Sequence, residues 1–509
     1  MKNLAQLDQK FVWHPFTQMR NWLQREPIVI ASGKGAVLRD VHGKEYLDAN
    51  SSIWTNLHGH QHPKINSAIT RQLKKISHSS ALGFANEPAS LLAAELVRSA
   101  NIRLPAKRPA AWELWKKFRE QEFRNHQLQK VFFSDDGSTA LETALKLAYQ
   151  FTLRTRGAKE RPKFLSLDGA YHGDTIGAVS LGQIDLFHKS YGGMLFKTDK
   201  VMSPYCYRCP FNRAKPERAD ARLYRQCHWE CIGKLEQKFS AQKKLGNPYA
   251  AFVFEPLMQG AAGMIAQPAV WLMQAKSIAR HYGALLIADE VMTGFGRTGR
   301  PNPGILPDAD RKDSAFKRVW DECNVLFASQ HEEVMPDFLC VAKGLTGGYL
   351  PMAATLTTQK IFDAFLGDYA EFKTFFHGHS FTGNQLGAAA SLASLEILQS
   401  KPSVMQRARL QKNLQAELQS LWSLPNVGDI RQVGLVAGIE LVKNWPTREP
   451  FALRERAGIR VCEAMAKRGV LTRPVGNVIV LMPPYCTTQK QLQKMVSALR
   501  EAVEITFKK

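Results

Sequence analysis

The sequence predicts an α/β protein in which helices flank a mostly parallel sheet, with a smaller α+β domain beside it. Short apolar segments alternate with stretches of helical periodicity through the middle of the chain. Two of these segments end abruptly in charged residues, one in Asp289 and the other in Lys343. The C-terminal part has a different pattern, in which long helical stretches surround strand-rich ones.

The middle of the chain supplies the expected elements of the large domain. We expect a strand where a short apolar run is bounded by turn residues, and a helix where apolar residues recur at helical spacing. The expected strands cover residues 130–134, 163–167, 250–255, 284–289, 338–342 and 353–358, and the expected helices cover 138–151 and 270–282.

Both ends of the chain supply the expected small domain. Residues 28–46 contain two turn signals and read as a β-meander. Towards the C-terminus we expect helices at 385–399, 403–422 and 453–468, and strands within 430–441 and 470–481. The expected domains are therefore residues 1–75 and 371–509 for the small one and 76–370 for the large one, with insertions near 101–129, 203–245 and 301–330.

Composition limits the classes of protein to consider. The chain has 509 residues, of which 45% are apolar, so it can bury a large core. We expect a cytoplasmic protein without a membrane partner, because the sequence shows neither a signal peptide nor an apolar run of about 20 residues. The net charge of +23 raises the question of nucleic acid. However, the basic stretches 103–130 and 208–225 lack a recognition-helix pattern, so we expect no nucleic-acid partner.

Lys343 and Asp289 are the first candidates for a functional site. Ligands in open α/β sheets bind at the carboxyl ends of the strands, which is where both residues are expected. An amine and a carboxylate placed there suit pyridoxal phosphate. The amine forms a Schiff base with the cofactor, and the carboxylate keeps the pyridine nitrogen protonated.

Two further segments follow expected strands. Residues 134–139 lead into a helix whose free N–H groups can hold a phosphate, although Thr139 and Glu142 also fit a plain capping box. Tyr171 follows another strand and can stack on a cofactor ring, but a surface tyrosine in a turn fits equally. The glycine-rich loop at 294–299 is not a dinucleotide fingerprint, because the G-x-G-x-x-G pattern is missing.

Two groups of residues raise the possibility of a metal. His377 and His379 have no third ligand nearby in sequence, so we expect this segment to contact a phosphate instead. Four cysteines have the spacing of a zinc ribbon and predict a structural zinc, with four reduced thiols as the alternative. They are Cys206, Cys209, Cys227 and Cys231.

Taken together, these motifs resemble the class III aminotransferases of fold type I, which use pyridoxal phosphate. More narrowly, the chain resembles the biotin-pathway 8-amino-7-oxononanoate aminotransferases. The run Trp-His-Pro-Phe-Thr-Gln-Met at residues 13–19 is the most specific of the matching motifs. The others are residues 51–54, 58–60, 171–175, 289–299, 343–348 and 471–474.

The resemblance implies a role for each matching residue at the cofactor. Lys343 would hold the cofactor and then move the proton, and Asp289 would pair with the ring nitrogen. The enzyme would be a homodimer with shared sites. The cofactor phosphate would be bound by Gly137 and Ser138 of one subunit and by His379 and Ser380 of the other.

The resemblance also implies the substrate contacts. Arg473 would bind the carboxylate of the oxo acid, and Gly378 would border the substrate. Tyr171 would stack on the cofactor ring and touch the substrate. The pocket wall would be formed by Phe16, Ile53 and Trp54.

Two positions depart from part of the family. Some members have Tyr where this chain has Phe16, and Trp where it has Ile53. The usual donor in the family is S-adenosylmethionine, but the branch with these features resembles enzymes that use lysine, so the donor stays open. One alternative is another class III ω-aminotransferase acting on a diamine, ornithine, 4-aminobutyrate or β-alanine. A second alternative is a degenerate enzyme that binds nucleic acid or a protein, against which the intact Lys343 and Asp289 argue.

Overall fold

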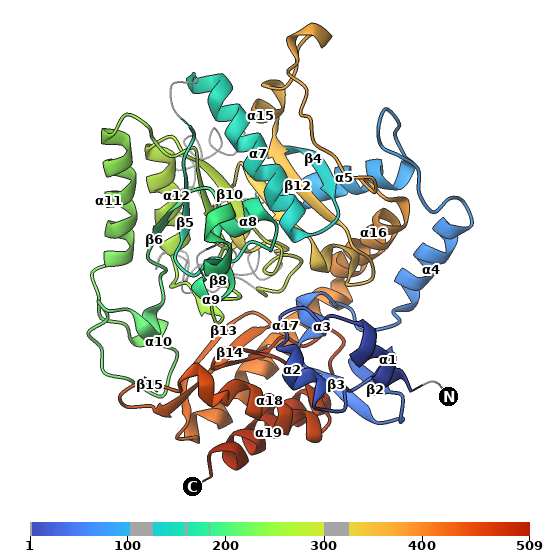
Figure 1. Ribbon diagram of the computed structural model, residues 1–509, viewed down its shortest axis with the longest axis vertical. Helices are drawn as coiled ribbons and strands as arrows, with labels where there is room; N and C mark the ends of the chain where they lie inside the picture. The colour runs from blue at the N-terminus through green and yellow to red at the C-terminus, as the bar shows by residue number, and fades with distance from the viewer. Residues whose placement is uncertain (1–2, 102–125, 158–160, 183, 300–324, 509) are drawn as a thin grey trace.

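The computed structural model describes residues 3–101, 126–157, 161–182, 184–299 and 325–508 (Figure 1). Its central sheet has seven strands in the order β4-β12-β11-β10-β7-β5-β6. Only β12 runs against its neighbours, pairing antiparallel with β11 and β4. The strands are β4 (Leu128–Ser134), β5 (Phe164–Leu167), β6 (Asp199–Val201), β7 (Ala251–Phe254), β10 (Leu285–Asp289), β11 (Phe338–Val341) and β12 (Ala353–Thr358). The mostly parallel sheet is therefore confirmed.

Helices cover both faces of this sheet, because its central strands are apolar on both sides. Side chains alternate between the faces along β10. Ile287 packs in one core cluster with Leu141, which lies on α7 (Gly137–Arg156). Leu286 and Ala288 pack in the other cluster, together with the helices α5 (Glu87–Ala100), α12 (Trp271–His281) and α16 (Gln385–Gln399). α11 (Glu230–Lys244) packs against α12 at the edge of the molecule (Figure 1).

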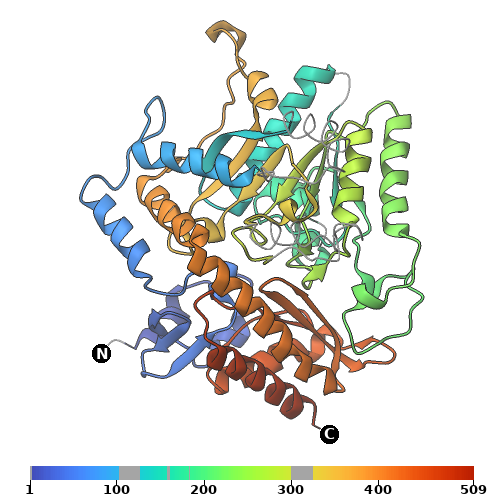
Figure 2. The same ribbon diagram turned by 180° about the vertical axis from the view of Figure 1, so that it is seen from behind.

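A second region combines the two ends of the chain. Its four-stranded sheet has the order β1-β2-β3-β16, in which the C-terminal β16 pairs in parallel with β3. Its other sheet contains β13, β14, β18 and β17, and both termini lie in this part of the molecule (Figure 2). The strands are β1 (Ile30–Lys34), β2 (Val37–Asp40), β3 (Glu45–Asp48), β13 (Val427–Val433), β14 (Val436–Asn444), β16 (Val470–Leu471), β17 (Pro474–Val475) and β18 (Val478–Leu481).

Several elements differ from the sequence-based expectation. The strand expected within 430–441 is a hairpin of β13 and β14, which turns at Gly434 with a φ of +58°. The helices α4 (Pro63–Leu73), α5, α11 and α19 (Gln489–Phe507) were not expected. The expected domain boundaries stay a prediction. Most of the insertions near 101–129 and 301–330 lies outside the described residues. None of the helices in the described ranges is both long and apolar enough to cross a membrane.

Candidate active site

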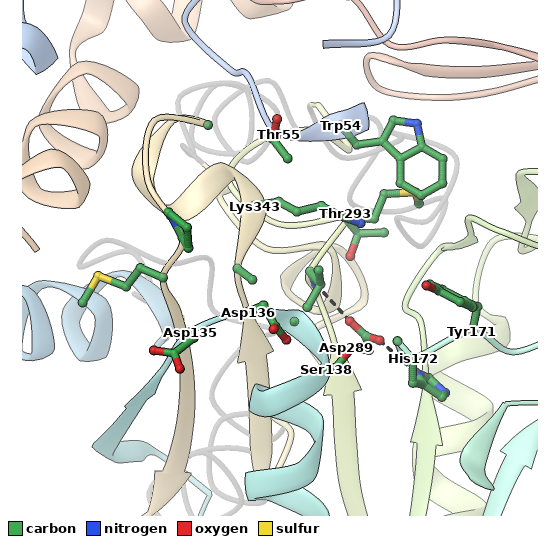
Figure 3. A pocket seen from close by; sticks show the side chains of 18 of the residues that line it. Trp54, Thr55, Asp135, Asp136, Ser138, Tyr171, His172, Asp289, Thr293 and Lys343 are labelled. Carbon is green, nitrogen blue, oxygen red and sulfur yellow. Dashed lines mark hydrogen bonds and ion pairs between the residues drawn. The ribbon is translucent and has the colours of Figure 1, made fainter. Parts of the chain in front are cut away.

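Polar side chains at or just beyond the ends of four neighbouring strands of the central sheet line one cavity. Asp289 ends β10, Glu255 follows β7, and Lys343 lies two residues beyond β11. β5 leads into the segment with Tyr171 and His172. These residues line a cavity of about 460 Å³, a size typical of small-molecule sites. Figure 3 shows Trp54 on one side of the cavity, Asp289 and Ser138 on the other, and Tyr171 at one end.

Lys343 is held in a strained conformation and is half-buried at the cavity. It begins the 3-10 turn η5 (Lys343–Thr346) with a φ of +46°, which an L-residue other than glycine rarely adopts. Its Nζ lies 4.7 Å from the centre of the Trp54 ring. Burial lowers the pKa of Lys343, and the carboxylates of Asp289 and Glu255 partly oppose this. The amine is therefore neutral, and able to act as a nucleophile, over a wider pH range than an exposed lysine.

Asp289 is fixed by two hydrogen bonds. Its Oδ2 lies 2.8 Å from Nδ1 of His172, and its Oδ1 accepts the N–H of Val291 at 3.0 Å. Burial alone would lower the pKa of His172, but the hydrogen bond and charge of Asp289, together with the charge of Glu255, outweigh burial and the pKa is raised. A protonated His172 and an ionised Asp289 therefore stabilise each other. His172 had no role in the sequence analysis, although it lies beside the predicted Tyr171.

The start of α7 offers backbone donors for an anion. Asp136 caps this helix by accepting the N–H of Thr139 at 2.9 Å, which leaves the N–H groups of Gly137 and Ser138 in its first turn. A Cβ on Gly137 would lie 2.8 Å from Val291, so only glycine lets these segments approach so closely. The alternative reading, a capping box of Thr139 and Glu142, does not hold, because the box is formed by Asp136 and Thr139.

Glu142 has a different role from the one expected. Its Oε1 accepts the N–H of Gly177 at 2.7 Å and that of Ala178 at 3.3 Å. Both residues lie in the first turn of α8 (Ile176–Leu181). A carboxylate at a helix N-terminus is stabilised by the helix dipole. Glu142 therefore joins α8 to α7 and fixes the segment that carries Tyr171 and His172.

Aromatic side chains close one end of the cavity. Tyr171 donates its hydroxyl to Asp174 at 2.7 Å, and its ring lies 6.1 Å from that of Phe187. Phe187 in turn contacts Phe16 edge-to-face at 5.3 Å. Phe16 is 58% exposed and is not among the residues that line the cavity, so it reaches Tyr171 only through Phe187.

Trp54 reaches the cavity from an unusual backbone turn. Ser51, Ser52, Ile53 and Trp54 all have positive φ, between 46° and 69°, which forms one left-handed turn without any glycine. Each such residue costs about 1–2 kcal/mol. The hydroxyl of Ser51 donates to the carbonyl of Met482 at 2.6 Å and helps to hold the turn. Trp54 faces the cavity, whereas Ile53 is 42% exposed and does not line it.

Besides Phe16 and Ile53, four more predicted site residues do not line the cavity. Gly378, His379 and Ser380 belong to a segment near its Asp135 edge, where Nδ1 of His379 lies 3.3 Å from Oδ2 of Asp135. Arg473 is exposed between β16 and β17. Their predicted roles involve a substrate or a partner subunit, so these roles stay predictions.

The cavity fits pyridoxal phosphate. It contains an amine, a fixed carboxylate and helix-start N–H donors, which match the aldehyde, ring nitrogen and phosphate of that cofactor. Tyr171 and Val291 supply the apolar surfaces that a flat ring needs. Fold and site together define the class of the protein, an α/β enzyme built for a pyridoxal phosphate cofactor.

Comparison with known proteins narrows this class. The family Aminotransferase class-III matches residues 19–302 and 324–503, and the chain belongs to this family of pyridoxal-phosphate-dependent aminotransferases. Two relatives bear the name adenosylmethionine-8-amino-7-oxononanoate aminotransferase. The protein of Nitratidesulfovibrio vulgaris is 43% identical over 98% of this chain and 81% of its own length. That of Geobacter sulfurreducens is 41% identical over 99% of this chain and 97% of its own length.

Solved structures agree with this assignment. The adenosylmethionine-8-amino-7-oxononanoate aminotransferase of Methanocaldococcus jannaschii has a TM-score of 0.80 and 36% identity, covering 99% of this chain and 98% of its own. An amine transaminase from an uncultivated Pseudomonas species, described as PLP-bound, has a TM-score of 0.78 and 29% identity, covering 97% of this chain and 98% of its own. The predicted fold and family are therefore confirmed.

The structure does not support the predicted zinc. Without a metal, burial raises the pKa of Cys206 to about 12 and that of Cys231 to about 11, so zinc would have to displace a proton from each buried thiol. Cys209 and Cys227 are half-buried free thiols. Within the described ranges, no three His, Cys, Asp or Glu side chains come together in a group that could hold a metal ion.

Proposed function

We propose that this aminotransferase converts 8-amino-7-oxononanoate to 7,8-diaminononanoate, a step of biotin synthesis, with S-adenosylmethionine or lysine as amino donor. The main support is the pairing of Lys343 and Asp289 at adjacent strand ends of one cavity. The names of relatives with 41–43% identity over almost the whole chain support the substrate.

The residues that line the cavity would each have a separate role in the reaction. When bound, pyridoxal phosphate supplies a ring that withdraws electrons from the carbon bearing the amino group. Lys343 would take a proton from that carbon and return it to the cofactor carbon on the other side of the nitrogen, which its lowered pKa favours because the free amine is the base. Asp289, oriented by His172, stabilises a proton on the ring nitrogen. Gly137 and Ser138 bind the phosphate through the start of α7.

Substrate recognition would come from the open side of the cavity. Arg473 binds the carboxylate of the oxo acid through a bidentate pair. Trp54 and Tyr171 enclose the reacting end of the chain, while Phe16 and Ile53 lie further out and affect the choice of donor. An aliphatic Ile53 lacks the indole face that a Trp at this position could place against a sulfonium, and this favours lysine as the alternative donor.

We also propose a cytoplasmic homodimer with shared sites. In it, His379 and Ser380 of each chain contact the cofactor phosphate bound by the other chain, and Gly378 borders the other chain's substrate. Exposed aromatic side chains around this segment support a subunit contact, since Phe376 is 69% and Phe381 is 59% exposed. No nucleic acid or membrane is needed for the activity.

A second candidate is another class III ω-aminotransferase, acting on a diamine, ornithine, 4-aminobutyrate or β-alanine. One observation favours it. The omega transaminase of Pseudomonas jessenii, described in complex with PMP, has a TM-score of 0.81 at 25% identity and covers 99% of this chain. The higher identity of the relatives named for 8-amino-7-oxononanoate, at 41–43%, favours the first proposal.

The test is product formation. Purified enzyme loaded with cofactor is incubated with 8-amino-7-oxononanoate and either S-adenosylmethionine or lysine, and 7,8-diaminononanoate is measured by mass spectrometry. Product with either donor supports the proposal, and the faster donor identifies the natural one. Absence of product with both donors, from enzyme that deaminates a simple diamine, would replace the proposal by the second candidate.

A further inference from the structure

Glu255 is a second buried carboxylate at the cofactor cavity. It follows β7, and the register pairs Phe254 of β7 with Ala288 of β10, so Glu255 and Asp289 are the next residues on neighbouring strands. Its side chain is 6% exposed and lines the cavity. A buried carboxylate without a lysine or arginine partner is costly, which makes it a candidate for function.

Its two oxygens join two segments of the site. Oε1 accepts the N–H of Tyr171 at 3.3 Å, and Oε2 accepts the N–H of Gly260 at 2.8 Å. The first bond fixes the backbone of the aromatic residue at the end of the cavity. The second fixes the turn after β8 (Met258–Gln259), whose Ala261 also lines the cavity. One side chain therefore sets the distance between two walls of the site.

Glu255 also contributes charge to the site. The titratable groups that face it are Asp289, His172, Lys343 and Tyr171. Burial raises the pKa of Glu255 to about 7; His172 opposes this shift and Asp289 adds to it. Glu255 therefore changes its charge near neutral pH. When ionised, it adds to Asp289 in raising the pKa of Lys343, which burial lowers.

We propose that Glu255 is a positioning residue of the cofactor site that fixes the backbone of Tyr171. Through the negative charge that it gains as the pH rises, it also favours the protonated form of the Lys343 amine. This rests on the proposed function only in assigning the cavity to pyridoxal phosphate. The identity of the amino acceptor does not enter it. Because the effect concerns the free amine of Lys343, it can be measured in the protein without cofactor.

Glu290 provides a matched control. It is also fully buried, its pKa is also raised to about 7, and it is the next residue after Asp289. However, its carboxylate accepts N–H groups of Ala328 and Ser329 and does not line the cavity. Glu255→Gln and Glu290→Gln thus remove the same group at the same depth, and only the first faces Lys343.

The test measures how fast Lys343 of the cofactor-free protein reacts with an amine-acylating reagent at pH 6 to 10, by peptide mass spectrometry. We expect Glu255→Gln to lower the titration midpoint of Lys343 by about half a pH unit or more, because an attractive negative charge is lost. Glu290→Gln should leave the midpoint unchanged. In the loaded protein, the pH titration of the cofactor absorbance should shift in the same direction. No shift in Glu255→Gln, or equal shifts in both variants, overturns the proposal.

Two further measurements separate charge from position. Glu255→Asp keeps the charge but is too short to hold both N–H groups, so it should keep the midpoint of Lys343 while weakening cofactor binding. A midpoint shifted as far as in Glu255→Gln contradicts this.

If Glu255→Gln does not fold, the pH profile of Lys343 reactivity in the wild type provides the test. The proposal requires an inflection near pH 7, where Glu255 ionises, and a profile with a single step overturns it. Each result stands whether or not 7,8-diaminononanoate is formed.

Discussion

The bond between Asp289 and His172 gives the sharpest quantitative prediction. Asp289→Asn removes the negative charge but keeps the shape of the side chain. The new amide can still accept the N–H of Val291. It can donate to Nδ1 of His172 only if the ring proton moves to Nε2, a buried atom without a hydrogen-bond partner among the described residues. The substitution therefore either leaves the amide N–H facing the Nδ1–H of a protonated ring or requires the ring to lose its charge.

The size of the effect follows from these contacts. A hydrogen bond to a charged group contributes about 1.5–3 kcal/mol. Both side chains are buried, with His172 at 3% and Asp289 at 6% exposure, so water cannot replace the bond. We therefore expect Asp289→Asn to lower the free energy of unfolding of the cofactor-free protein by about 1.5–3 kcal/mol at pH 6.

The effect should depend on pH in one direction. The pKa of His172 is raised above its usual 6.5 in the folded protein. A raised histidine pKa contributes stability that is fully present below pH 6.5 and is lost as the pH rises through the folded pKa. The difference between wild type and Asp289→Asn should therefore be largest at pH 6 and smaller at pH 9.

A double-mutant cycle isolates this pair. The free energy of unfolding is measured by urea denaturation for wild type, Asp289→Asn, His172→Gln and the double variant, at pH 6 and pH 9. We expect a coupling energy of about 1.5–3 kcal/mol at pH 6 that falls at pH 9. A coupling energy below about 0.5 kcal/mol, or one that grows with pH, would refute the reasoning.

Three further substitutions test other parts of the site. Lys343→Ala should abolish turnover and the visible absorbance of the bound cofactor, and unchanged turnover would place the reactive amine elsewhere. Arg473→Ala should raise KM for the oxo acid at least ~10-fold, because a hydrogen bond to a charged group is lost, and should change KM for the donor little. Equal increases of KM for both substrates in kinetic assays would contradict the role of Arg473. Ile53→Asn should raise the free energy of unfolding by about 0.5–1 kcal/mol, because asparagine tolerates the left-handed φ of 65° better than isoleucine. A lower Tm in thermal denaturation would show that the turn is not strained.

The sequence predicted the sheet and the core of the site for a clear physical reason. Buried parallel strands read as continuous apolar runs, so the charged residues that end them stand out. Asp289 and Lys343 were found in this way and Tyr171 as an aromatic residue that follows another strand, and the structure brings all three to one cavity. The start of α7 was found through the turn residues before it, although the capping role of Asp136 was not expected.

Other features left no readable signal. The left-handed turn at Ser51–Trp54 contains no glycine, so nothing in the sequence marks its positive φ values. His172 and Glu255 became visible only through contacts between residues far apart in the chain. The spacing of the four cysteines predicted a zinc, yet spacing cannot report how the side chains are placed in the fold, and the described residues contain no group of three His, Cys, Asp or Glu side chains that could hold a metal ion.

Lys343 is the residue on which the proposed chemistry depends most, because it is the amine expected to hold pyridoxal phosphate. Reduction of the loaded enzyme with borohydride makes the link between cofactor and amine permanent, and peptide mass spectrometry then locates it. We predict the added mass on the peptide that contains Lys343 and on no other. The same mass on another lysine, such as the buried Lys276, would contradict the central claim.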